Sequence, residues 1–158
     1  MIVLCADHAG FELKEFIKKI LEKNSIEYID CGASEYNKDD DYPDIVHSAV
    51  PKVLENNDNA GIFVCGSGVG VSMVANRYKG IRAVLANDYA TAFLARKDED
   101  SNVLCMGARI VSKRMARKII KVFFSTEFEA EDTKDASKNF NKIKMLYFQF
   151  NIFFYFII

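Results

Sequence analysis

The feature of this 158-residue chain that most limits its fold is a regular alternation of short apolar runs with amphipathic stretches. The apolar runs are rich in β-branched residues and nearly continuous, as in parallel strands that are covered on both faces. They lie at residues 2–6, 26–31, 61–65, 81–86 and 103–106. Helical periodicity marks residues 11–23, 44–56, 69–79, 89–97 and 112–125. This order predicts a doubly wound α/β sheet with right-handed connections.

Two local features refine this prediction. Pro51 lies inside the second helical stretch, where a proline has no N–H to donate, so we expect a kink or a late start of that helix. In a doubly wound sheet, ligands bind beyond the carboxyl ends of the strands. Polar residues that directly follow the apolar runs are therefore the first candidates for a site.

Composition sets broad limits on function. Half of the residues are apolar and 27% are charged, which is ordinary for one globular domain with a buried core. The net charge of −1 argues against a nucleic-acid partner, because such a protein needs a concentrated basic face. A small anionic substrate fits, since a few cations and backbone N–H groups can hold it.

The four cysteines stand singly in the sequence, at positions 5, 31, 65 and 105. No pair has the close spacing of a zinc site, and the chain is too long and apolar for a disulfide scaffold. The N-terminal run reaches Asp7 too early for a secretory leader. These features predict a reduced, cytoplasmic protein. Two histidines are too few for a histidine-rich metal site, so we expect no metal.

The end of the chain differs from the rest. Residues 127–144 are charged and predicted to be helical, and we assign residues 1–144 to one domain. Residues 145–158, MLYFQFNIFFYFII, carry no charge but are too few to span a membrane. They fit an oligomer-contact strand, a short membrane-seeking tail, or translated sequence outside the domain proper. We prefer the last, because nothing earlier in the chain has this composition.

Polar residues gather at three of the predicted strand ends. Asp7-His8 follows the first strand, CGSGVG (65–70) closes the third, and Gly107-Ala108-Arg109 follows the fifth. The first two ends should meet in space, because parallel strands share one carboxyl edge. The glycine-rich turn lacks the Gly-Lys pair of a P-loop and the glycine spacing of a dinucleotide fingerprint. Its glycines, Gly66, Gly68 and Gly70, fit an anion-binding turn or a tight connection that needs positive φ.

Cys65 stands at the entrance of this turn. A lone cysteine in a strand is usually a small buried hydrophobe, which suits the other three cysteines. Cys65 differs because the N-terminus of a predicted helix follows directly, and the helix dipole favours a thiolate. On spacing alone, Cys65 fits equally well as a nucleophile partnered by His8 and as a general base.

The other candidates also have structural alternatives. Ser67 can cap the following helix or contact a substrate. Asp7-His8 can be an acid–base or hydroxyl-orienting pair, or a strand-end cap beside a surface imidazole. His47, inside an ordinary helix, is interpreted as structural. The charged run at residues 97–100 is by default a solvated loop.

With these residues assembled, the chain resembles the type B ribose-5-phosphate isomerases and the related galactose-6-phosphate isomerase subunits. The matching stretches are ADHAG (6–10), DYP (41–43), CGSGVG (65–70), GIRA (80–83) and NVLCMGAR (102–109), in family order. The resemblance implies a Rossmann-like three-layer α/β/α fold with a five-stranded, mostly parallel sheet in a single domain. It also implies aldose–ketose isomerisation of a phosphorylated sugar, foremost ribose 5-phosphate to ribulose 5-phosphate, without metal or organic cofactor. Its active sites lie between the subunits of a homodimer or homotetramer.

The resemblance assigns roles to individual residues. Cys65 is the general base, and Ser67 with the backbone of Gly66, Gly68 and Gly70 stabilises the enediolate. Asp7, His8 and Tyr42 orient sugar hydroxyls, and Arg109 holds the phosphate. Asp98, as a catalytic residue, and Glu99, as a substrate-binding residue, occupy the place of the histidine and asparagine of the family.

Two departures from the family pattern concern ring opening and phosphate binding. In the family, the residue that aligns with Asp98 is a histidine that opens the sugar ring. The pKa of an aspartate is in general further from neutral pH than that of a histidine, so aspartate is less suited to proton transfer there. Two further phosphate-binding arginines of the family align with acidic or apolar residues at 130–136. Lys134 and Lys138 are the nearest replacements.

Three functional hypotheses follow from this pattern. The favoured one is an active isomerase with altered ring-opening and phosphate groups, whose partner is a small sugar phosphate and no nucleic acid. The second is the cysteine-bearing subunit of a hetero-oligomeric galactose-6-phosphate isomerase, in which another chain supplies the missing groups. The third is a catalytically silent sugar-phosphate-binding module.

Overall fold

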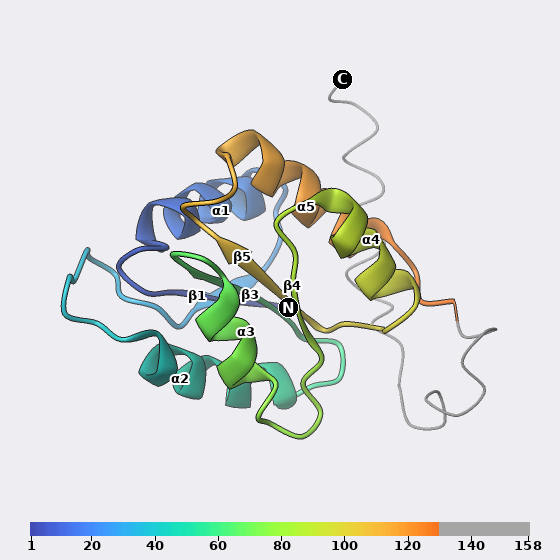
Figure 1. Ribbon diagram of the computed structural model, residues 1–158, viewed down its shortest axis with the longest axis horizontal. Helices are drawn as coiled ribbons and strands as arrows, with labels where there is room; N and C mark the ends of the chain where they lie inside the picture. Colours follow the sequence, from blue (N-terminus) through green and yellow to red (C-terminus); the bar gives the residue numbers. More distant parts are fainter. Residues whose placement is uncertain (130–158) are drawn as a thin grey trace.

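The computed structural model describes residues 1–129, in which five strands alternate with five helices (Figure 1). The strands are β1 (Ile2–Ala6), β2 (Tyr28–Asp30), β3 (Ala60–Cys65), β4 (Ala83–Leu85) and β5 (Val103–Gly107). The helices are α1 (Phe11–Lys23), α2 (Tyr42–Leu54), α3 (Val69–Ala75), α4 (Tyr89–Lys97) and α5 (Lys113–Ser125). Most of the predicted helical segment 127–144 and all of the tail 145–158 lie outside the described residues.

The strands form one sheet in the order β2-β1-β3-β5-β4, and every neighbouring pair is parallel. Helices α1, α4 and α5 lie on one face of the sheet and α2 and α3 on the other (Figure 1). The predicted doubly wound, three-layer fold is thereby confirmed. From β1 the chain moves to β2 on one side, and from β3 it moves to β4 and back to β5 on the other side, so the ends of β1 and β3 flank the topological switch point.

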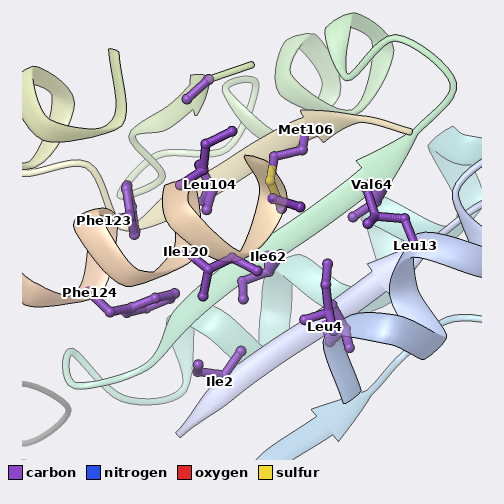
Figure 2. Close-up of a cluster of buried hydrophobic side chains, with 14 of the residues drawn as sticks. Ile2, Leu4, Leu13, Ile62, Val64, Leu104, Met106, Ile120, Phe123 and Phe124 are labelled. Carbon is purple, nitrogen blue, oxygen red and sulfur yellow. The ribbon is translucent and has the colours of Figure 1, made fainter. Parts of the chain in front are cut away.

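The core explains why the central strands are continuously apolar. Ile2, Leu4, Ile62 and Leu104 point from the sheet towards Leu13 of α1 and the apolar side of α5 (Figure 2). The alternate residues of the same strands, among them Val3, Phe63 and Cys105, pack under α2 and α3. Burying each large side chain stabilises the fold by about 1.5–3 kcal/mol, so both faces of the sheet contribute.

Four elements differ from the prediction by two or more residues at one end. Among residues 1–129, β2 and β4 are the edge strands of the sheet and pair on one side only, and both are shorter than predicted. α2 begins at Tyr42 with Pro43 in its first turn, where proline is well tolerated, and it continues through Pro51. The expected late start is therefore wrong. α3 ends at Ala75, before the turn that leads to Gly80. Within residues 1–129, every helix is too short or too polar to cross a membrane.

Candidate active site

Three adjacent strands carry predicted site residues at their carboxyl ends. The β1–β3 ladder pairs Ala6 with Val64, and it continues as the Asp7 N–H donates to the Val64 carbonyl oxygen at 3.3 Å. On the other side of β3, Cys65 pairs with Gly107. The predicted meeting of the first and third strand ends is confirmed, and Gly107-Ala108-Arg109 joins them at the same edge.

Cys65 is buried at the end of β3, with 5% of its surface exposed. The Gly68 N–H donates to its Sγ at 3.1 Å, and an N–H directed at sulfur interacts more strongly with a thiolate than with a thiol. Within residues 1–129, no acceptor takes the backbone N–H of Gly66 or of Ser67. The turn therefore offers donors to a negative charge that develops beside the sulfur.

The glycines of the turn serve different purposes. Gly68 has φ +81° and is the N-cap of α3, so the alternative N-cap role for Ser67 is wrong. The Ser67 side chain is exposed, and its Oγ accepts from the Val69 N–H at 3.3 Å. Gly70 does not have a positive φ, but the absence of a side chain lets the ring of Tyr42 pack against its backbone. A Cβ at this position would lie 2.7 Å from the ring. The predicted positive φ is thus confirmed for Gly68 only.

Arg109 lies against the same turn. Its N–H donates to the Gly66 carbonyl oxygen at 2.9 Å, and its guanidinium carbon lies 3.1 Å from where a Cβ of Gly66 would be. The preceding turn is held by Asn87, whose Oδ1 accepts from the Gly107 N–H at 2.9 Å. Sequence reasoning missed Asn87, although it is a polar residue two positions after β4.

His8 is paired with an acidic residue that sequence reasoning also missed. Its Nδ1 lies 2.9 Å from Oδ1 of Asp40, and its backbone N–H donates to the same oxygen at 2.7 Å. The hydrogen bond to Asp40 raises the pKa of His8 above its ordinary value. Asp40 is the middle residue of an acidic run that precedes Tyr42, and nothing in the sequence distinguishes it from its neighbours.

Asp7 lies beside His8 and is 7% exposed. Its Oδ1 accepts from the Gly10 N–H at 2.9 Å, which closes the turn into α1. Burial raises the pKa of the Asp7 carboxyl, and the hydrogen bond from Gly10 opposes this effect. One carboxylate oxygen thus has a backbone donor, and the position suits binding of a substrate hydroxyl.

Asp98 and Glu99 lie at the amino edge of the sheet, where the strands begin, opposite the carboxyl edge that carries Cys65. Asp98 caps the C-terminus of α4, and the loop then enters β5 at Val103, which pairs with the start of β3. Both side chains are exposed. Within one chain, the structure therefore does not bring these two residues to Cys65.

The loop that carries Asp98 and Glu99 is fixed by its next residue. Asp100 is 4% exposed, has φ +47°, and accepts from the guanidinium groups of Arg82 at 2.9 Å and Arg96 at 2.8 Å. The prediction of a plain solvated loop is therefore wrong for Asp100. The two residues before it are held in place by this buried anchor.

Other predictions concern groups outside this edge. The His47 Nδ1 is hydrogen-bonded to the Tyr78 hydroxyl, which ties α2 to the segment after α3, as a structural role requires. The four cysteines are free thiols. Among the described residues, no three His, Cys, Asp or Glu side chains are grouped so as to hold a metal ion.

Residues 2–143 match the family model described as Ribose/Galactose Isomerase. The chain belongs to the ribose/galactose isomerase family. It is a sugar-phosphate aldose–ketose isomerase by this membership, and the expected resemblance is confirmed.

Individual relatives span most of the chain. The probable ribose-5-phosphate isomerase B of Mycoplasma pneumoniae is 42% identical over 128 residues, which cover 81% of this chain and 84% of the relative. The crystal structure of ribose-5-phosphate isomerase B from Mycoplasma genitalium with bound ribulose-5-phosphate is 39% identical and gives a TM-score of 0.78. It covers 81% of this chain and 85% of its own. D-erythrulose-4-phosphate isomerase 2 of Mycolicibacterium smegmatis is 34% identical over 142 residues, covering 87% and 92% of the two chains.

Proposed function

We propose that the chain interconverts ribose 5-phosphate and ribulose 5-phosphate through an enediolate, with Cys65 as the general base. The observation that carries this proposal is the position of Cys65. Its buried sulfur, with an N–H donor 3.1 Å away, lies at a turn in which the Gly66 and Ser67 N–H groups have no acceptor among the described residues. Asp7 and His8 lie at the end of the neighbouring strand. This combination suits removal of a proton next to a carbonyl group.

The reaction balances with these groups alone. The Cys65 thiolate takes the proton from C2 of the open-chain aldose, and the C–H electrons form the C1=C2 double bond as the carbonyl electrons move to O1. Ser67 Oγ and the free N–H groups stabilise the resulting oxyanion. The C2 hydroxyl then loses its proton to O1, and the thiol returns the first proton to C1. The product is the ketose, and the thiolate is regenerated.

The remaining predicted residues hold the substrate. Asp7, His8 and Tyr42 contact sugar hydroxyls, because they surround the entrance to the turn at strand and helix ends. Arg109 binds the phosphate, with its guanidinium placed over Gly66. Segment 130–136, which aligns with the missing family arginines, lies outside the described residues.

A second copy of the chain completes the site. β4 is an edge strand, and exposed apolar side chains flank it: Val69 and Met73 on α3, and Tyr89 and Phe93 on α4. We place the two-fold axis beside β4 and perpendicular to the strands, so that the strands of the two copies run in opposite directions. It therefore places the amino edge of one sheet, with Asp98 and Glu99, beside the carboxyl edge of the other. The partner thus supplies the two residues that one chain cannot bring to Cys65.

Light scattering on the purified chain tests this dimer. Met73→Glu together with Phe93→Glu is expected to give a monomer whose circular dichroism is unchanged and whose isomerase activity is lost. A Leu54→Glu variant on α2, also apolar and 43% exposed but outside α3 and α4, controls for added charge and should stay dimeric. A homotetramer would show that further surfaces assemble.

Free thiols at all four cysteines suit a reducing compartment, so we place the protein in the cytoplasm.

The function itself is tested by incubating the purified chain with four-, five- and six-carbon aldose phosphates and measuring ketose. We expect turnover of ribose 5-phosphate that is abolished in Cys65→Ala. The four-carbon substrate is included because one relative is a D-erythrulose-4-phosphate isomerase. Activity of this chain alone excludes the need for a different subunit. A folded protein that turns over none of these sugars would overturn the proposal.

A further inference from the structure

We infer that His8 and Asp40 form the proton-transfer pair that opens the sugar ring before isomerisation, an inference that rests on the proposed function. Ribose 5-phosphate closes into a furanose, so a ring-opening step must precede the chemistry at Cys65. The chain carries an aspartate at position 98, and it has only two histidines, His8 and His47. Of these, only His8 lies at the carboxyl edge of the sheet with Cys65.

The hydrogen bonds of His8 fix both its orientation and its tautomer. One oxygen of Asp40 accepts from the His8 backbone N–H at 2.7 Å and lies 2.9 Å from Nδ1. An ionised carboxylate can only accept, so Nδ1 carries the proton of this contact. Nε2 is then the ring nitrogen left for a substrate. This carboxylate–imidazole arrangement is the one that orients histidine for acid–base catalysis.

The exposure of the pair agrees with this division of roles. One third of the His8 side chain is exposed, whereas 11% of the Asp40 side chain is. The imidazole is therefore open to a ligand while the carboxylate behind it is mostly covered. His8 is also one residue beyond Asp7, whose N–H bonds to the residue before Cys65. The charged groups that face the imidazole are Asp40 and Asp7.

The step balances without any further reagent. Nε2 of the neutral imidazole accepts the proton of the anomeric O1–H, and the O–H electron pair forms the C1=O1 double bond. The C1–O4 bond breaks, and its electrons go to the ring oxygen. The imidazolium, stabilised by Asp40, then gives the proton to that oxygen. The open-chain aldehyde is ready for Cys65, and His8 is neutral again.

Steady-state kinetics with ribose 5-phosphate test the inference first. His8→Gln keeps a hydrogen-bonding amide but cannot carry a proton, and we expect kcat to fall about 100-fold, the lower end of the usual effect of an acid–base group. Asp40→Asn should lower kcat less. His47→Gln removes the other histidine from a structural contact and is the matched control with unchanged kcat. An increase of KM with an unchanged kcat in His8→Gln would assign His8 to substrate binding and overturn the inference.

The second measurement observes ring opening by itself. In a Cys65→Ala background isomerisation is blocked, so exchange between the α and β anomers of ribose 5-phosphate, followed by NMR, reports the opening step alone. We expect Cys65→Ala to accelerate this exchange, Cys65→Ala/His47→Gln to do the same, and Cys65→Ala/His8→Gln to lose the acceleration.

Each other result counts against His8. If Cys65→Ala/His8→Gln keeps the acceleration and Cys65→Ala/Asp98→Asn loses it, ring opening belongs to Asp98. No acceleration in Cys65→Ala also overturns the inference. The proposed isomerase function is judged separately, because it fails only if the unmodified chain turns over no sugar phosphate.

Discussion

The two edges of the sheet differ in how their functional residues are held. At the carboxyl edge, the residues around Cys65 are interlocked by short backbone bonds, such as those from Ala108 and Arg109 to the cysteine turn at 2.8 and 2.9 Å. At the amino edge, Asp98 and Glu99 are exposed, and only the following Asp100 is anchored. The residues of the carboxyl edge are thus held by one another, whereas at the amino edge two exposed residues precede one buried residue.

Under the proposed function, one protomer holds the base and the anion-binding turn, and a second copy supplies the remaining groups. A rigid turn suits Cys65, because a proton transfer tolerates little error in geometry. An exposed but anchored loop suits residues that must enter the site of a neighbour. Variants at the carboxyl edge should therefore lower kcat. Variants of the buried anchor Asp100 at the amino edge should lower the free energy of unfolding.

The largest expected effect is that of Cys65→Ala. Removing the general base should lower kcat for ribose 5-phosphate by roughly 10²–10⁴-fold, with the thermal unfolding transition almost unchanged, because a small buried side chain is replaced by a smaller one. Cys31→Ala, a half-buried thiol near the core but away from the turn, is the control and should keep its activity. Equal activity loss in both variants would mean that packing, not the thiol, matters.

At the amino edge, Asp100→Ala should act on stability. The substitution removes the carboxylate shared by Arg82 and Arg96, and breaking such a buried pair typically costs about 3–5 kcal/mol. The positive φ of residue 100 adds to the cost, because alanine tolerates it poorly. Urea denaturation measures the effect. Asp98→Ala, two residues away and exposed, should change the free energy of unfolding by less than about 0.5 kcal/mol.

Two glycines with similar φ give a matched test of the carboxyl edge. Gly68 has φ +81° and Gly80 has φ +92°. A Cβ at Gly68 would lie 2.7 Å from the Met106 carbonyl carbon, whereas one at Gly80 meets nothing closer than Leu54 at 3.2 Å. Gly80→Ala should cost about 1–2 kcal/mol for the left-handed conformation alone.

Gly68→Ala should therefore cost distinctly more in urea denaturation and should also reduce kcat, because the backbone that faces Cys65 has to move. If the two alanine variants were equally stable and equally active, the close packing of the turn would not matter for the site.

Much of this architecture could be predicted from the sequence because it depends on local pattern. The continuous apolar runs gave all five strands, and the break of pattern at Cys65 indicated the turn that follows it. What the sequence could not give are contacts set by tertiary structure. Asp40 reaches His8 across 32 positions, and Asn87 reaches Gly107 across 20. Neither is distinguished by spacing.

The placement of Asp98 shows a different limit. Its position at the end of a helix that leads into β5 already implied the amino edge, yet the family pattern grouped it with Cys65. Asp98 can lie at the amino edge of its own chain and also beside a Cys65 only if that Cys65 belongs to a second copy. Symmetry is a property of the assembly, and periodicity within one chain carries no signal for it.

The smallest expected effect concerns the charge of His8. The hydrogen bond to Asp40 raises the pKa of His8, so the folded chain binds this proton more tightly than the unfolded chain does. The resulting stabilisation is fully present below the ordinary histidine pKa of about 6.5, and it is lost as pH rises through the raised value.

NMR titration of the His8 ring should show a midpoint above the ordinary histidine pKa. Asp40→Asn should bring it down, whereas Asp98→Asn, at the other edge of the same chain, should leave it unchanged in the monomeric interface variant. In the proposed dimer, a downward shift in Asp98→Asn places the Asp98 of the second copy beside His8, and so joins the two edges in one site.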